Sequence, residues 1–384
     1  MKAVRSSSVT SEGSKVSKKS NPTLCFKHCL TFLFQTFFWG MLMFGQPATA
    51  KEKLEFTYGA PSFTPDSQKL VFDRYPQSGE PRIHVLDLKT NALTYYEPPA
   101  GQMWFSGKFS PSGKQMVFVM VPLFSKDLPA TGSNRDYANS QIAIMDADGK
   151  NVRMLTQGPG YKKAPNFSWS GKKVIFVKAE LRKPGSKTLD THNDVHEIHV
   201  ETGATRQLTN FEFFQMGRPS YLPGDKEFVV NADTPMTRGP MTVEESKDWW
   251  ESMRQMQAKN HSSEVRRFHA NPQVQTLQPL FIDPFYYARN VAVDALGNLY
   301  FEAQPSKQDR TRVYRSAPDG GLESWAVTPH LQPRSHEISP DGRLWVQISR
   351  PALDDDLNGI FALDLTDGTW REIPANGPAQ RINP

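Results

Sequence analysis

A short turn motif recurs six times along most of the chain, and it constrains the fold more than any other feature. The copies, four clear and two weaker, span residues 63–72, 109–118, 167–176, 338–346, 221–230 and 293–301. In a full copy Pro presets φ, Asp or Ser caps the turn and Gly supplies a positive φ, so Ser-Pro-Asp-Gly forms a tight turn between strands. The β-branched and aromatic residues after each turn predict a buried strand.

Two further strands are predicted after the turn strand in five of the units. The first set covers residues 82–88, 140–146, 195–200, 312–316 and 359–365. The second, shorter set covers residues 92–96, 152–155, 205–208, 324–327 and 369–373. Four strands in a unit of roughly 40 to 50 residues are typical of a propeller blade. The fold class predicted is therefore all-β, a six-bladed β-propeller of four-stranded antiparallel blades.

The repeat resembles the propeller repeats of the TolB family. Each full unit follows the pattern Ser-Pro-Asp-Gly-Lys-x-apolar-x-Phe, and residues 83–88 and 360–365 are good copies of the Ile-x-Val-x-Asp-Leu strand that comes next. The resemblance covers residues 54–374 and implies an envelope-associated complex. The sequence before the first unit leaves no room for the α/β domain that precedes the propeller in TolB itself. Residues 291–300 also resemble lactonase-type repeats, in one blade only.

The charge balance excludes some classes of function. Six of the 45 basic residues and one of the 40 acidic residues lie in the first fifty, which leaves 39 of each in the remainder. No basic footprint for nucleic acid is expected there. Both cysteines, Cys25 and Cys29, lie in the first segment, so the remainder has no disulfide, thiolate nucleophile or cysteine-bound zinc. A mean hydropathy of −0.55 excludes a multi-span membrane protein.

Residues 1–50 have the pattern of a secretory signal peptide. A basic region is followed by an apolar stretch over residues 30–44 and by small residues ending at Ala50. The apolar stretch is shorter than the roughly 20 residues of a spanning helix. We expect cleavage after Ala50, no integral membrane span in the mature chain and a periplasmic location. The alternative is an uncleaved signal anchor.

The two ends of the repeat region carry their own predictions. Leu54, Phe56 and Tyr58 alternate with polar residues, and we interpret them as a strand that pairs with the last blade and closes the ring. Residues 375–384 are rich in Pro, Gly and Asn and are expected to form a flexible tail. The chain is expected to be a monomer.

Insertions over residues 122–139, 180–194 and 235–262 indicate where a partner binds. Within the third of them, Thr242 to Glu245 form a capping box, and a Trp/Met stripe predicts a helix in the fourth blade. The stripe either packs on the propeller as a lid or faces a partner. We expect the insertions to share one face, whose candidate partner-binding residues are Trp249, Trp250, Met253, Arg254, Arg135, Asp136 and Tyr137.

Two clusters are candidate metal ligands, although neither has the full pattern. His192 and His196 share a face of an extended segment, but the third histidine, His199, occupies a repeat position. Asp354, Asp356 and Asn358 match the front half of a calcium loop, yet position 12 is Leu365. We therefore expect no cofactor, with a divalent metal such as calcium as the alternative.

The sequence favours a binding scaffold over an enzyme. It contains no Gly-x-Ser-x-Gly elbow, P-loop or dinucleotide fingerprint. We expect an exported scaffold that binds a protein or peptide partner of the cell envelope through its loop-decorated face and axial mouth. The alternative is a metal-dependent small-molecule enzyme of the lyase or lactonase type that uses the central channel. A carbohydrate-binding module is a third possibility, suggested by aromatic content alone.

Overall fold

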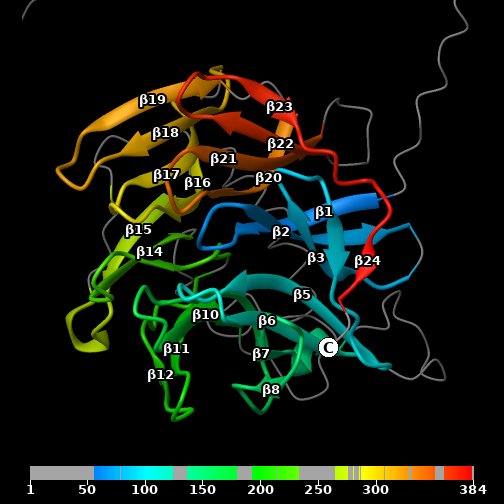
Figure 1. Cartoon of the computed structure of the whole chain (residues 1–384). Coiled ribbons are helices and arrows are strands. Elements are labelled where there is room, and N and C mark those ends of the chain that lie inside the picture. Colours follow the sequence, from blue (N-terminus) through cyan, green and yellow to red (C-terminus); the bar gives the residue numbers. More distant parts are fainter. Residues whose placement is uncertain are drawn as a thin grey trace, which may run out of the picture. The chain divides into compact units, whose positions relative to one another are not determined.

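The computed structural model describes residues 56–382, apart from 78, 124–135, 180–192, 214, 233–263, 276–279, 281–284, 286, 307, 328–330 and 351–358. In these residues the strands form six sheets of consecutive antiparallel strands, and the first sheet gains one parallel strand from residues 380–381. The sheets follow one another around a ring in chain order (Figure 1). The six-bladed propeller predicted from the repeat is confirmed.

The first three blades have four strands each, in simple up-and-down order. Blade 1 consists of β1 (Phe56–Phe63), β2 (Lys69–Pro76), β3 (Arg82–Asp87) and β4 (Leu93–Tyr95). Blade 2 consists of β5 (Gln102–Phe109), β6 (Gln115–Pro122), β7 (Gln141–Asp146) and β8 (Arg153–Met154). Blade 3 consists of β9 (Tyr161–Phe167), β10 (Lys173–Ala179), β11 (Asn193–His199) and β12 (Thr205–Gln207).

The last three blades repeat this order, with three strands in the described part of blade 4. Blade 4 consists of β13 (Ser220–Tyr221), β14 (Glu227–Ala232) and β15 (Glu264–His269). Blade 5 consists of β16 (Tyr287–Val293), β17 (Leu299–Gln304), β18 (Arg312–Ser316) and β19 (Leu322–Val327). Blade 6 consists of β20 (Leu331–Ile338), β21 (Leu344–Arg350), β22 (Gly359–Asp364) and β23 (Trp370–Glu372).

The turn motif joins the first and second strands of the blades. Within these turns, the amides of Thr64, Ser110, Ser168 and Ser339 each donate to the carbonyl five residues on. Gly113, Gly171 and Gly342 all have a φ of +71° at the same turn position. Glycine reaches this conformation at little steric cost, which confirms the role predicted for it.

The core lies between the blades. Each pair of neighbouring blades shares one cluster of buried apolar side chains, and blade 6 packs against blade 1 in the same way. The largest fully buried side chains include Trp345, Phe118 and Phe176. Because no single sheet can bury both of its faces, the closed ring is what removes this surface from water.

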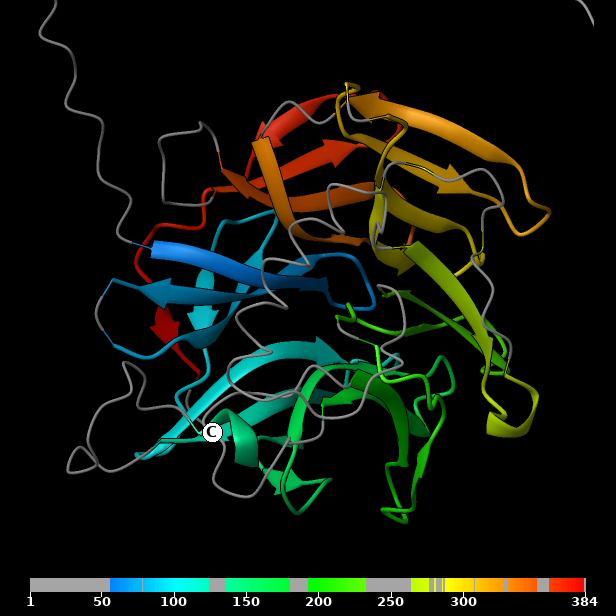
Figure 2. The ribbon, with the colours of Figure 1, turned by 180° about the vertical axis from the view of Figure 1, so that it is seen from behind.

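The ends of the chain close the ring in a different way from the one predicted. β1 pairs with β2 in its own blade, not with the last blade. Instead, part of the segment expected to be a flexible tail forms β24 (Gln380–Arg381), which adds to β4 as a parallel fifth strand. Arg74 also donates to the carbonyls of Asn376 and Gly377. Figure 2 shows β24 beside blade 1 from behind.

The three insertions predicted from the sequence lie in the connections between the second and third strands of blades 2, 3 and 4. They begin after Pro122, Ala179 and Ala232, at the end of the blades opposite to the motif turns. The helical elements in the described residues are two 3-10 turns, η1 (Tyr137–Asn139) and η2 (Pro272–Val274). The helix predicted within residues 235–262 falls outside the described residues, which therefore give it no support. The described residues also lack a helix with the length and apolar character needed to cross a bilayer.

Candidate binding site at the axial mouth

A cavity of about 250 Å³ is lined by residues from all six blades, which places it on the axis of the ring. Its lining lies at the end of the blades that carries the motif turns, and we call it the axial mouth. The apolar lining residues are Phe63, Pro65, Phe109, Pro111, Phe167, Trp169, Tyr221, Val293, Ala295, Ile338 and Pro340. The polar lining residues are Lys108, Asn166, Ser168, Ser220 and Glu337.

The repeat itself builds the apolar wall of the axial mouth. The innermost strand of each blade ends on an apolar residue directly before its turn, and these six residues are Phe63, Phe109, Phe167, Tyr221, Val293 and Ile338. We call them the apolar collar. The ring symmetry brings one copy from each blade to the axis. The collar is therefore a direct consequence of the motif.

Three charged side chains gather at the axial mouth, and we call them the charged floor: Lys108 and Glu337 line the cavity, and Arg218 pairs with Glu337. The ammonium of Lys108 in blade 2 lies 2.7 Å from the Glu337 carboxylate in blade 6. The guanidinium of Arg218, which precedes blade 4, lies 3.0 Å from the same carboxylate oxygen. Arg218 also donates to the Pro61 carbonyl of blade 1 at 3.2 Å. This charged floor joins four blades across the axis and has a formal net charge of one positive.

The buried carboxylate of the floor is held in its ionised form. Burial alone raises the pKa of Glu337, but the adjacent Lys108 and Arg218 lower it, and the net shift is downward. Burial lowers the pKa of the Lys108 ammonium, against the opposing effect of Glu337. Because a buried carboxylate is costly unless it is paired, the two cations are what keep Glu337 in place.

Hydrogen bonds between neighbouring inner strands make the floor rigid. The Asn166 amide donates to Ser220 Oγ at 3.0 Å and to the Pro219 carbonyl at 3.3 Å. The Ser62 hydroxyl donates to the Gly107 carbonyl at 2.8 Å. The site is thus largely preorganised, which reduces the ordering cost of binding.

A buried carboxyl group lies near the floor, on the face of blade 1 that packs against blade 2. Both oxygens of Asp73 accept from the backbone N–H of Ser106, at 2.9 and 3.0 Å. Ser106 has a φ of 57° within an irregular part of β5, which directs its N–H at this carboxyl group. Burial raises the pKa of Asp73 to about 8, although Ser106 and Arg218 oppose the shift.

Two of the residues predicted to bind a partner lie in the described part of the structure. Tyr137, in η1, packs its half-buried ring against Phe105 and Tyr161, with centroids 6.4 and 5.4 Å away. Asp136 accepts from the Asn139 side chain at 2.8 Å. The other five, Trp249, Trp250, Met253, Arg254 and Arg135, lie outside the described residues. Partner binding by this set stays a prediction.

Of the metal candidates, His196 lies in the described residues, and the grouping of the others stays a prediction. His196, on β11, stacks on Phe176 with ring centroids 5.7 Å apart. His192, Asp354, Asp356 and Asn358 lie outside the described residues. Across the part of the chain that the structure describes, no three His, Cys, Asp or Glu side chains form a group that could hold a metal ion.

Sequence reasoning missed the residues of the charged floor. Lys108 and Glu337 each precede a collar residue, and Arg218 lies two residues before β13. A polar residue directly before the last residue of an inner strand could have indicated a polar side chain near the axis of the ring. The partners could not be read from it, because they come from different blades.

No known protein-family profile matches the chain. Comparison with solved structures finds TolB from Acinetobacter baumannii, with a TM-score of 0.53 and 14% identity over 83% of this chain and 63% of that one. An oligogalacturonate lyase in complex with manganese also has a TM-score of 0.53, with 15% identity over 83% of this chain and 79% of that one. A puromycin hydrolase has a TM-score of 0.50, with 15% identity over 83% of this chain and 45% of that one.

These similarities define the fold class. The described residues form a propeller with the same architecture as TolB and the related propellers. The chain spans less than two thirds of the TolB chain that it matches. At identities of this level the similarity shows the fold alone, and function has to be argued from the site.

Proposed function

We propose that this chain is a binding scaffold that holds an extended segment of a protein or peptide partner at the axial mouth. The observation that carries the proposal is the apolar collar around a charged floor that is already paired and rigid. Recessed pockets that take a large side chain of the partner and exclude water around it are characteristic of protein-recognition sites. The similarity in fold to TolB fits this class of function.

The size of the axial mouth favours an inserted side chain over a whole small-molecule substrate. Its volume of about 250 Å³ lies below the range of roughly 300 to 1,000 Å³ common for small-molecule sites. Such a space takes one or two large apolar side chains, which the collar would surround. The net positive floor favours carbonyl or carboxylate oxygens of the same segment.

The loop-decorated end of the blades is part of the proposal as a second contact surface. Trp249, Trp250, Met253 and Arg254 have the residue types that dominate protein interfaces. The insertion that contains them leaves the blades at the end opposite to the axial mouth. A partner that reaches both surfaces would have to span the ring.

We also propose an exported, periplasmic location and a complex of the cell envelope. The signal peptide predicted over residues 1–50 supports export, and the TolB-like fold is consistent with it. N-terminal sequencing of the purified native protein tests this directly. A mature terminus at Lys51 is expected, and a terminus at Met1 would contradict cleavage.

Site-specific photo-crosslinking tests the proposed function. p-Benzoylphenylalanine would replace Phe109 in the collar or, as a control, Trp325, an exposed aromatic on the outer strand of blade 5. Irradiation of intact cells should give a discrete protein crosslink from position 109 that position 325 does not give. Equal patterns from both positions would reject the axial mouth as the binding site.

One observation favours the alternative, a metal-dependent lyase or lactonase-type enzyme. His336 Nδ1 lies 3.3 Å from the Glu302 carboxylate in the core between blades 5 and 6, and both side chains are fully buried. The Gln347 side chain, also fully buried, makes no hydrogen bond within the described residues. Elemental analysis of the native protein separates the two functions, since one divalent ion per chain would favour the enzyme and a metal-free protein the scaffold.

A further inference from the structure

The C-terminal segment shows that an outer blade edge of this propeller accepts an extended chain. Gln380 and Arg381 pair in parallel with Thr94 and Tyr95 of β4, and the Ile382 amide donates to the Tyr95 carbonyl at 2.9 Å. The Ile382 side chain packs on the apolar cluster between blades 1 and 2. The segment therefore binds by strand addition together with one anchoring aliphatic side chain.

The next edge around the ring has equivalent backbone geometry. The Leu155 amide donates to the Ile142 carbonyl at 2.8 Å, just as the Tyr96 amide donates to Ile83 at 3.0 Å. Arg153 and Met154 of β8 thus correspond to Thr94 and Tyr95 of β4. Alternation along a strand then directs the N–H and C=O of Met154 away from β7, as in Tyr95.

This edge stays open in the described residues. The sheet of blade 2 ends at β8, and no described strand pairs with its outer side. Met154 is 52% exposed at this edge. Open edges of this kind are templates for a further strand.

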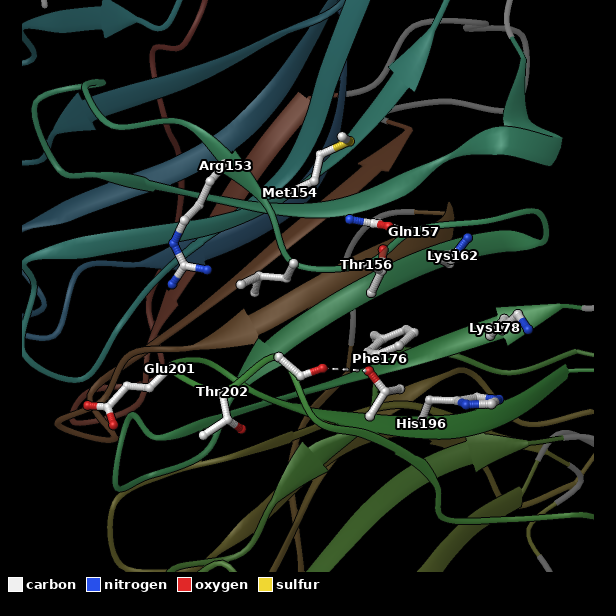
Figure 3. Close-up of a pocket in the computed structure, with 13 residues that line it drawn as sticks. Arg153, Met154, Thr156, Gln157, Lys162, Phe176, Lys178, His196, Glu201 and Thr202 are labelled. Atoms are coloured by element: carbon white, nitrogen blue, oxygen red, sulfur yellow. Dashed lines mark hydrogen bonds between the residues drawn. The ribbon is translucent and has the colours of Figure 1, made fainter.

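A cavity of about 580 Å³ adjoins β8 between blades 2 and 3. Figure 3 shows Arg153 and Met154 on the blade 2 side, and Phe176, Lys178 and His196 on the blade 3 side. The Phe176 and His196 rings stack with an interplanar angle of 25°. Leu155, which lines this cavity, corresponds in register to Tyr96 of the apolar cluster on which Ile382 packs.

The charge of the lining indicates the chemistry of the occupant. Arg153, Lys162 and Lys178 line the cavity, against one acidic residue, Glu201. The Lys162 ammonium donates to the carbonyls of Ser140 and Gly158, so it holds the wall of the cavity together. An occupant with an acidic side chain beside Arg153 complements this lining.

We propose that the groove beside β8 binds an extended acidic segment of a partner protein as a parallel fifth strand of blade 2. An aliphatic side chain of the segment lies beside Leu155, which lines the groove, and an acidic side chain two residues earlier lies beside Arg153. The groove is separate from the axial mouth, so this inference stands or fails independently of the proposed function.

The test uses a ten-residue peptide with the sequence of residues 375–384 and the change Gln380→Glu, labelled with a fluorophore. That sequence already pairs with one blade edge, and glutamate at position 380 would lie opposite Arg153 in the equivalent register. Anisotropy titration with the full chain should give saturable binding. Methylation of the peptide amide at the Ile382 position should weaken it about fivefold to tenfold, because that N–H would donate to Met154.

A matched pair of protein variants identifies the edge used. Arg153→Glu should weaken binding about fivefold, whereas Arg371→Glu, at the equivalent position on β23 of blade 6, should leave it unchanged. The methylated peptide leaves the protein itself intact, so its effect does not depend on the folding of a variant. The proposal would be overturned if the peptide showed no saturable binding, or if the methylated peptide bound as tightly as the unmethylated one. It would also be overturned if Arg153→Glu and Arg371→Glu had the same effect on binding.

Discussion

Lys108 and Glu337 are 229 residues apart in the chain, yet their charged groups lie 2.7 Å apart at the axis of the ring. Arg218 makes a second ion pair with the same carboxylate, from a third blade. The closed ring is what brings these residues together. The charged floor therefore serves both to join opposite blades and to present a fixed polar centre to a partner.

Replacing the shared carboxylate should strongly destabilise the ring. Glu337→Gln would leave two buried cations without a counter-charge, which costs about 3 to 5 kcal/mol for pairs of this kind. Urea unfolding followed by fluorescence measures the change. Glu323→Gln is the control, because Glu323 is 63% exposed and its pair with Arg315 is long, at 3.7 Å. Similar losses for the two variants would contradict a structural role for the floor.

Asp73 should make the protein less stable as the pH rises from about 6 to 8. Its pKa is raised to about 8 in the folded chain, from 3.8 in the unfolded chain. The stabilisation is therefore complete below pH 3.8 and is lost as the pH rises toward 8, at up to about 1.4 kcal/mol per pH unit.

Asp73→Asn isolates this effect, since its amide oxygen still accepts from Ser106 and does not titrate. Unfolding free energies measured at pH 6, 7 and 8 should fall less for the variant than for the unaltered chain. Parallel pH dependences would show that Asp73 titrates normally.

Deleting residues 380–384 should destabilise blade 1, because it removes β24 and exposes the edge of β4. The hydrogen bond from Ile382 to Tyr95 and the packing of Ile382 would both be lost, at a cost of about 1 to 3 kcal/mol. Thermal unfolding and amide exchange of β4 report the change. A chain that lacks only residues 383–384 is the control, and equal protection of β4 in both would count against this role of the tail.

The strands were predictable because the turn motif and the alternating pattern are local. All ten strands expected after the turn strands begin and end within two residues of those observed, and the largest differences are at β11 and β19, which each begin two residues before the expected range. β15 of blade 4 was missed, since its sequence Glu264–His269 contains charged residues and follows the longest insertion.

The closure and the site depend on contacts that no local pattern encodes. The alternation at Phe56 and Tyr58 correctly indicates a strand but does not identify its partner, which is β2. β24 is two residues long in a Pro- and Gly-rich segment, so only the open edge of β4 makes it a strand. Lys108 and Glu337 share a polar position of the repeat, but the ring decides that they pair with each other and with Arg218.

The central claim is that the axial mouth binds a partner segment, and one titration tests it most directly. A peptide selected by display on the purified chain would be titrated by calorimetry into that chain, into Phe109→Ser and into Trp325→Ser. The account predicts one site per chain, an affinity at least about tenfold weaker for Phe109→Ser, as expected for an interface anchor, and no change for Trp325→Ser. Unchanged binding by a folded Phe109→Ser protein would contradict it.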